Sequence, residues 1–246
     1  SIFSGKLDVT INTKRKNLTV FFSDIKSFTT ITEKLEPEVL TELITNYLTE
    51  MTEIAINYGG TIDKYIGDAI MIFFGDPLSS GIRKDAISCV SMALEMKRKL
   101  RKLKKNWESA GLSESLDVRM GIHTDVCTVG NFGSADRLDY TVLGNGVNLA
   151  SRLESSAGAN EILISENTHN LINKDIESQF FGEIKVKGKS HPVKAYKVLD
   201  KISKNTKQGI VNISKNGFSL KVDKDKIKDK NTIIAILEDS IDNLTK

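Results

Sequence analysis

The sequence predicts an α+β fold in which helices and mostly antiparallel strands are mixed. Two long segments repeat apolar residues at helical spacing, one from Pro37 to Tyr58 and one from Lys84 to Lys105. Short apolar runs rich in β-branched and aromatic residues lie between and after them, which is typical of strands. Gly67-Asp68 joins two of these runs with the length of a tight hairpin turn.

The chain up to Lys105 is predicted to contain three strands and the two long helices. A buried strand at Leu18–Phe22 ends at Ser23-Asp24. Pro37 suits the first turn of the next helix, and Gly59-Gly60 suits its end. The apolar stripe of that helix consists of Val39, Leu43, Tyr47, Met51, Ile54 and Tyr58. The other two predicted strands are Thr61–Ile66 and Ala69–Phe74.

The chain after Lys105 is predicted to be richer in strands. A helix from Val147 to Glu154 follows the glycine turn Gly144-Asn145-Gly146. The predicted strands are Leu116–Ile122, Leu138–Leu143, Glu161–Ser165, Phe180–Val186 and Ala195–Leu199. From Asp200 onward the chain is lysine-rich, with an apolar island at Ile210–Leu220 and a helical pattern near its end. We therefore expect two parts, 1–199 and 200–246, of which the second is an extension or subdomain of unknown role.

Composition narrows the class of protein. A net charge of +3 is too small to indicate a nucleic acid or a membrane surface as partner. Two cysteines give no disulfide framework, which fits the cytoplasm, and Cys89 is predicted to be a buried, inert thiol. No run approaches the ~18 apolar residues of a membrane helix. Because the chain starts at Ser1 without Met, we expect a piece of a longer protein that could carry a sensor or membrane anchor upstream.

Two aspartates follow apolar strands and could meet at one sheet edge. Asp24 comes just after the first strand, and Asp68 lies at the hairpin tip. Taken singly, Asp24 could cap a helix and Asp68 could form a turn. Together, two facing carboxylates repel unless a cation lies between them. Such a pair suits two metal ions that grip one phosphate.

Asn148 and Arg152 form a second group. They are four residues apart on the predicted helix after the glycine turn, so they share a face. An amide and a guanidinium there could hold a sugar and phosphate oxygens. The alternative is a surface pair on an amphipathic helix.

Four motifs carry a family resemblance. They are Phe22-Ser23-Asp24-Ile25 with Phe28-Thr29, Gly60–Ala69, Arg119–Thr124 and Asp139–Glu154. In this order, and over about Leu18–Leu199, the chain resembles the class III nucleotidyl cyclases, and within them the bacterial adenylate cyclase catalytic domain.

The resemblance implies a ferredoxin-like core and a homodimer with two shared sites. It also implies conversion of ATP to 3′,5′-cyclic AMP and pyrophosphate with two divalent ions, Mg²⁺ or Mn²⁺. By motif position, Asp24, Asp68 and the carbonyl of Ile25 match the metal ligands. Asn148 matches the residue that positions the ribose, and Arg152 matches the transition-state arginine.

Substrate contacts are implied in the same way. Lys64 and Thr141 match the pair that reads the purine, and a lysine can donate to adenine N1 but not to the N1–H of guanine. Arg119 matches an arginine near the dimer site. Lys187 matches the triphosphate lysine, and Lys189 is close enough to be an alternative.

Some residues depart from the family pattern. Thr141 replaces an aspartate found in many members, and threonine occurs in a subset that includes bicarbonate-responsive enzymes; bicarbonate response is therefore a hypothesis. Asp125 stands where a glycine usually follows the His-Thr pair, and His123 is expected to be structural. The alternatives are a guanylate cyclase, a diguanylate cyclase, whose hairpin signature is absent, and a catalytically silent nucleotide-binding domain.

Overall fold

The computed structural model describes residues 13–109, 116–134, 138–185, 192–202, 210–215, 217–223, 226–227 and 229–244. Contacts divide the chain into two compact units, Ser1–Lys201 and Ile202–Lys246. In the second unit, β9 (Ile210–Lys215) pairs antiparallel with β10 (Phe218–Asp223), and the helix α6 (Lys230–Leu244) follows. The site lies in the first unit.

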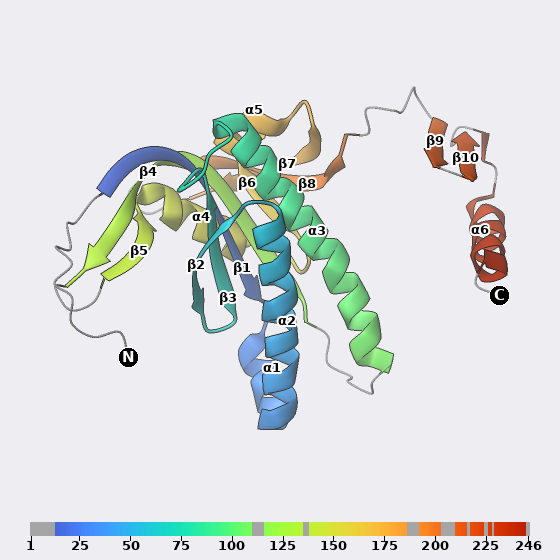
Figure 1. The fold of residues 1–246 in the computed structure, drawn as a ribbon, viewed down its shortest axis with the longest axis horizontal. Helices are drawn as coiled ribbons and strands as arrows, with labels where there is room; N and C mark the ends of the chain where they lie inside the picture. The colour runs from blue at the N-terminus through green and yellow to red at the C-terminus, as the bar shows by residue number, and fades with distance from the viewer. Residues whose placement is uncertain are drawn as a thin grey trace. The chain divides into compact units, whose positions relative to one another are not determined.

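The first unit combines one sheet with five helices among its described residues (Figure 1). The strands are β1 (Thr13–Ile25), β2 (Thr61–Ile66), β3 (Ala69–Phe74), β4 (Val118–Gly133), β5 (Leu138–Leu143), β6 (Ile162–Ser165), β7 (Ile176–Ile184) and β8 (Val193–Lys201). The helices are α1 (Phe28–Lys34), α2 (Pro37–Asn57), α3 (Ile82–Ser109), α4 (Asn145–Ser156) and α5 (Glu166–Ile172).

The sheet order is β2-β3-β1-β4-β6-β8-β7, and β5 pairs with the far end of β4. Among the described pairs, β4 and β6 run parallel and the others run antiparallel. The predicted α+β class with a mixed, mostly antiparallel sheet is therefore confirmed.

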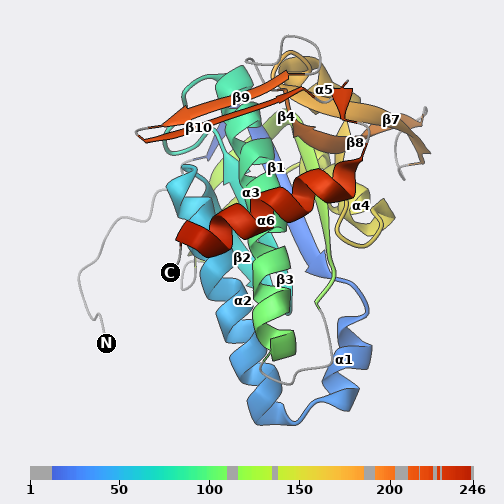
Figure 2. The same cartoon turned by 90° about the vertical axis from the view of Figure 1, so that its right-hand side faces the viewer.

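Helices cover both faces of the sheet, with α2 and α3 on one face and α4 on the other (Figures 1 and 2). Successive residues of a strand point to opposite faces, and β1 follows this rule. Val20 and Phe22 pack with Ala150 of α4, whereas Phe21 and Ile25 pack in the cluster that contains α2 and α3. The even-numbered positions at the end of β1 therefore face α4.

The helix α4 lies very close to β4 at Gly121. A Cβ atom at Gly121 would be 2.1 Å from the amide nitrogen of Glu154 and 2.3 Å from the carbonyl oxygen of Ala150. Since both atoms belong to the backbone, no side-chain movement could make room. The glycine thus fixes the distance between the sheet and the helix that carries the predicted site residues Asn148 and Arg152.

Most predicted elements are present, with differences at their ends. The hairpin strands β2 and β3 have the predicted bounds. The strand expected at Leu116–Ile122 begins at Val118 and continues to Gly133, and the strand expected at Phe180–Val186 is Ile176–Ile184. The helices α1 and α5 were not predicted, because seven residues each are too few for a helical apolar repeat.

Candidate active site

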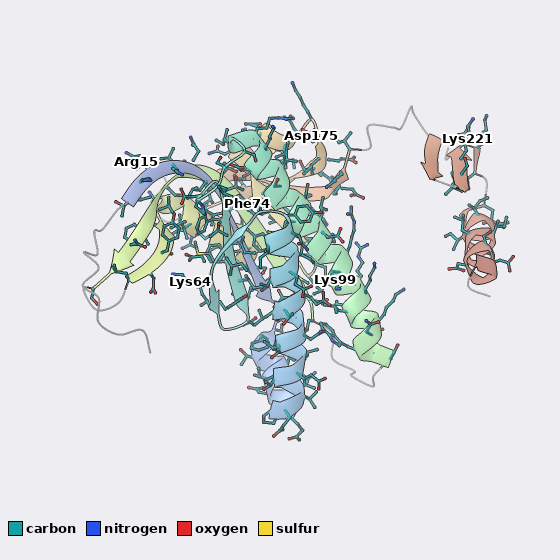
Figure 3. All side chains as sticks on the ribbon, viewed as in Figure 1. Arg15, Lys64, Phe74, Lys99, Asp175 and Lys221 are labelled. Carbon is teal, nitrogen blue, oxygen red and sulfur yellow. The ribbon has the colours of Figure 1, made fainter. Side chains whose placement is uncertain are left out.

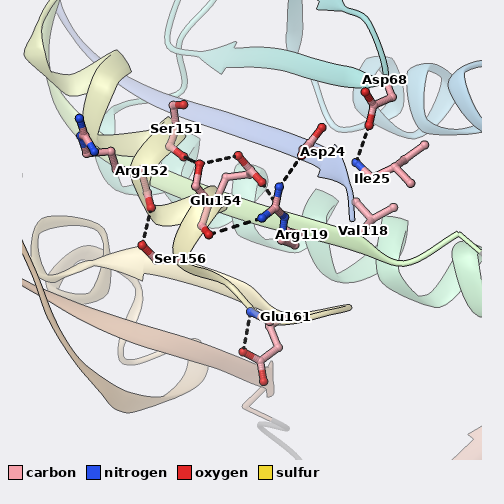
Figure 4. A network of polar contacts seen from close by, with 12 residues as sticks. Asp24, Ile25, Asp68, Val118, Arg119, Ser151, Arg152, Glu154, Ser156 and Glu161 are labelled. Carbon is pink, nitrogen blue, oxygen red and sulfur yellow. Dashed lines mark hydrogen bonds and ion pairs between the residues drawn. The ribbon is translucent and has the colours of Figure 1, made fainter. Parts of the chain in front are cut away.

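The two aspartates Asp24 and Asp68 lie next to each other. Asp24 is the penultimate residue of β1, and pairing of β3 with β1 brings the β2–β3 turn beside that strand end. Asp68 Oδ2 accepts a hydrogen bond of 3.0 Å from the backbone nitrogen of Ile25 (Figure 4). Burial, together with the hydrogen bond and negative charge of Asp24, raises the pKa of Asp68 to about 6. Burial and the negative charge of Asp24 therefore both oppose ionisation of Asp68.

This donor set fits a hard divalent cation. Two carboxylates and neighbouring backbone carbonyls are the oxygen ligands that Mg²⁺ and Mn²⁺ prefer, and Mg²⁺ usually completes its shell with water and substrate phosphates. A cation between the carboxylates would offset the repulsion by Asp24, which adds to the effect of burial in raising the pKa of Asp68. Within the described ranges, no group of three or more His, Cys, Asp or Glu side chains gathers as a fully protein-made metal site.

Arg119 lies directly across the sheet from Asp24 and between two acids. It is the cross-strand partner of Asp24 in the β1–β4 register, and its Nη2 donates to Asp24 Oδ2 at 2.5 Å. Its Nε is 3.1 Å from Glu154 Oε1, an ion pair without hydrogen-bond alignment. Figure 4 shows this chain of contacts from β1 through β4 to α4. Arg119 thus holds Asp24 in place from the face that α4 covers.

Glu154 also belongs to this cluster, although it was not among the predicted site residues. Its side chain is 8% exposed, and burial raises its pKa to about 7, against the opposing effect of Arg119. The available signal was its position, because Glu154 continues the buried stripe of α4 formed by Gly146, Leu149, Ala150 and Leu153. A carboxylate in an otherwise apolar stripe indicates a partner on the facing strand.

Lys64 and Thr141 come together through a residue that was not predicted, Asp63. Lys64 lies on β2 at the edge of the sheet (Figure 3), and Thr141 lies on β5, which contacts β2 without pairing with it. Thr141 Oγ1 donates to Asp63 Oδ2 at 3.0 Å, and Lys64 Nζ is 3.4 Å from the same oxygen. One carboxylate therefore links both residues of the predicted purine-reading pair.

Asn148 and Arg152 are exposed on α4. Neither side chain forms a hydrogen bond or ion pair with the residues that the structure describes. In Figure 4 the Arg152 guanidinium points away from the cluster of Asp24, Arg119 and Glu154. The same helix thus turns Glu154 toward the carboxylates of its own chain and leaves Arg152 free to contact other molecules.

The other predicted residues either lie outside the described ranges or are buried in the core. Lys187 and Lys189 lie outside the described residues. Cys89 is fully buried, as predicted, and burial raises the pKa of its thiol well above the usual value. His123 is also buried and shares a hydrogen bond of 2.7 Å with Ser165 Oγ, which fits a structural part in the core.

Comparison with known proteins identifies the family. Residues 11–200 match the family described as the adenylate and guanylate cyclase catalytic domain. The chain therefore belongs to this family, and the predicted class III cyclase resemblance is confirmed.

Solved structures and a curated relative agree with this assignment. The adenylyl cyclase CyaB from P. aeruginosa is 53% identical, with a TM-score of 0.75 over 77% of this chain and 97% of that chain. The guanylyl cyclase Cya2 is 32% identical, with a TM-score of 0.73 over 78% of this chain and 96% of that chain. The terminal-differentiation-specific adenylate cyclase of Dictyostelium discoideum is 35% identical over 75% of this chain.

The chain spans 9% of the length of that Dictyostelium relative. Among the described residues, no helix is both long and apolar enough to cross a membrane.

Proposed function

We propose that the chain is an adenylate cyclase domain that converts ATP to 3′,5′-cyclic AMP and pyrophosphate. The observation that carries this proposal is the convergence of Lys64 and Thr141 on one carboxylate. Lysine presents donors alone, so it suits the N1 acceptor of adenine and not the N1–H of guanine. A threonine hydroxyl beside it can accept from the adenine 6-amino group.

The reacting phosphate would be bound at the end of β1. Asp24, Asp68 and the carbonyl of Ile25 would hold two Mg²⁺ or Mn²⁺ ions. When bound, these ions would lower the pKa of the ribose 3′-hydroxyl and neutralise charge on the triphosphate. Arg119 would keep the Asp24 carboxylate oriented, and its own charge would limit repulsion between that carboxylate and the buried Glu154.

The base and phosphate contacts, including those of Lys64 and Thr141, would come from a second copy of the chain in a homodimer with two shared sites. Asn148 would position the ribose, and Arg152 would stabilise the charge that develops on the α-phosphate. Lys187, or Lys189 beside it, would bind the triphosphate. Support for sharing comes from the exposed Arg152, whose guanidinium points away from the carboxylates of its own chain.

The proposed catalytic domain comprises residues 1–199, and residues 200–246 form a lysine-rich C-terminal extension or subdomain of unknown role. We place the domain in the cytoplasm of a bacterium, where its product would act as a signal. The second candidate is a guanylate cyclase, since the chain is similar to Cya2 as well. Lys64 argues against it, because family guanylate cyclases carry an acidic residue at this position.

Product identification tests the proposal. Purified protein is incubated with equal concentrations of ATP and GTP and either Mg²⁺ or Mn²⁺, and the cyclic nucleotides are separated and quantified. Cyclic AMP should predominate, and Asp24→Ala should abolish its formation while leaving the thermal unfolding transition in place. Preferential formation of cyclic GMP would reject the base assignment. Folded wild-type protein that forms neither product would favour a catalytically silent domain.

A further inference from the structure

Asp63 is a buried carboxylate with an unusual pair of neighbours. Its side chain is fully shielded from solvent, while the neighbouring Lys64 side chain is 43% exposed. Its Oδ2 accepts from the Thr141 hydroxyl and pairs with the Lys64 ammonium. Its Oδ1 is buried without a hydrogen-bond partner in the described part of the chain. Because an unpaired buried carboxylate oxygen costs stability, stability alone does not account for an acid at this position.

The contact between Asp63 and Thr141 determines the direction of a hydrogen bond. A threonine hydroxyl has one proton and two lone pairs, so it can donate or accept. A carboxylate only accepts, so the Thr141 proton must point toward Asp63. Thr141 is 5% exposed, which leaves little room for water to supply a competing partner. The hydroxyl oxygen therefore presents only lone pairs to any other group that approaches it.

This polarity distinguishes the two purines. The 6-position of adenine carries an amino group, which donates, whereas the 6-position of guanine carries an oxygen, which accepts. A hydroxyl that is held as an acceptor matches adenine and leaves guanine with two facing acceptors. Lys64 keeps further N–H donors for the purine N1, because an ammonium has three. One carboxylate can thus orient the Thr141 hydroxyl while it pairs with the Lys64 ammonium.

We propose that Asp63 is a specificity-determining positioning residue, which orients the Thr141 hydroxyl as an acceptor and so selects adenine over guanine. This inference rests on the proposed function, in which Lys64 and Thr141 read the base. Asp63 does not touch the nucleotide in this arrangement. It acts through Thr141, and without it the hydroxyl can turn and donate to guanine O6.

The test compares kcat/KM for ATP and GTP in Asp63→Leu, which keeps the side-chain size and removes the acceptor. The ATP preference should fall by about tenfold, the value of one oriented hydrogen bond. Asp63→Asn should lie between wild type and Asp63→Leu, because the amide can turn either its oxygen or its NH₂ group toward Thr141. An equal loss for both nucleotides in Asp63→Leu would indicate a merely structural role and overturn the proposal.

A double-mutant cycle tests the route of the effect. Thr141→Val removes the hydroxyl, so Asp63→Leu should not change the ATP preference further in that background. Additive losses would contradict action through Thr141. Asp85→Asn is the matched control, because Asp85 is also buried and accepts from the Ser79 hydroxyl at 2.5 Å. It should lower stability and leave the nucleotide ratio unchanged.

Two further measurements separate failure of this inference from failure of the proposed function. If Asp63→Leu gives no cooperative unfolding transition, the ratio is taken from Asp63→Asn, where a wild-type value would overturn the proposal. Binding of α,β-methylene analogues of ATP and GTP, which cannot be cyclised, measures the same ratio without turnover. Wild-type protein that neither cyclises nor binds adenine nucleotide would reject the proposed function. Wild-type activity with an unchanged ratio in the Asp63 variants would reject this inference alone.

Discussion

Replacing Gly121 with alanine should displace α4 and thereby remove cyclase activity. The new Cβ atom would lie 2.1 Å from the Glu154 amide nitrogen, whereas ordinary contacts begin near 3.4 Å. The obstacle is the backbone of the helix itself, so α4 must move away from β4 by about 1 Å. Overpacking of this kind costs about 1–3 kcal/mol, which corresponds to a fall in Tm of roughly 3–10 °C for a domain of this size.

The effect on activity should exceed the effect on stability. Asn148 and Arg152 are carried by α4, and a misplacement of about 1 Å costs on the order of 100-fold in rate. The control is Gly158→Ala, whose Cβ would meet only the flexible Glu161 side chain at 2.9 Å. Thermal unfolding and initial rates of cyclic AMP formation measure both variants. If Gly121→Ala kept the wild-type Tm and kcat, β4 and α4 could not lie as close together as the Gly121 distances indicate.

Three other changes test separate parts of the site and the fold. Lys64→Ala should lower kcat/KM for ATP by about 10- to 100-fold, since one charged hydrogen bond is lost; an unchanged value would remove Lys64 from base recognition. Asp68→Asn should abolish activity without lowering Tm in metal-free buffer, because it relieves two opposed carboxyl groups, and Mg²⁺ should raise the Tm of wild type alone. Burial works to raise the pKa of Asp76, but hydrogen bonds from Lys16 and Tyr140 hold it below its usual value. Its ionised form therefore stabilises the fold above a pH of about 4 and loses this effect below it, so Asp76→Asn should lower the urea midpoint at pH 7 and much less at pH 3.

The local sequence was enough to predict the helices and strands whose apolar repeat is long or ends at a glycine. The hairpin of β2 and β3 was predicted to the residue, because two apolar runs flank Gly67-Asp68. The predicted helix from Val147 to Glu154 lies within α4, which runs from Asn145 to Ser156. The strand β4 was predicted at less than half its length, because its second part depends on pairing with β1 on one side and β5 on the other. Such pairing over long separations leaves little mark on the local sequence.

The residues of the candidate site also differ in whether the sequence alone could predict them. Asp24 and Asp68 could be proposed as neighbours, because strand ends and hairpin tips can be located from the sequence. Asp63 could not, because its partner Thr141 is 78 residues away and on a strand that does not pair with β2. Glu154 was overlooked although it stands in the apolar stripe of α4. Asp63 and Glu154 are both buried acids. Their roles depend on contacts with residues that are distant in the sequence and meet only in the folded chain.

Mixing two inactive variants shows whether each active site is built from two copies of the chain. Asp24→Ala and Arg152→Ala are each purified, shown to fold, and assayed for cyclic AMP formation alone and after mixing. Each variant alone should be inactive. Mixed dimers should regain activity, because one of their two shared sites combines an intact Asp24 from one copy with an intact Arg152 from the other. Mixed dimers that form, as shown by pull-down through a tag on one copy, and yet remain inactive would contradict the shared site.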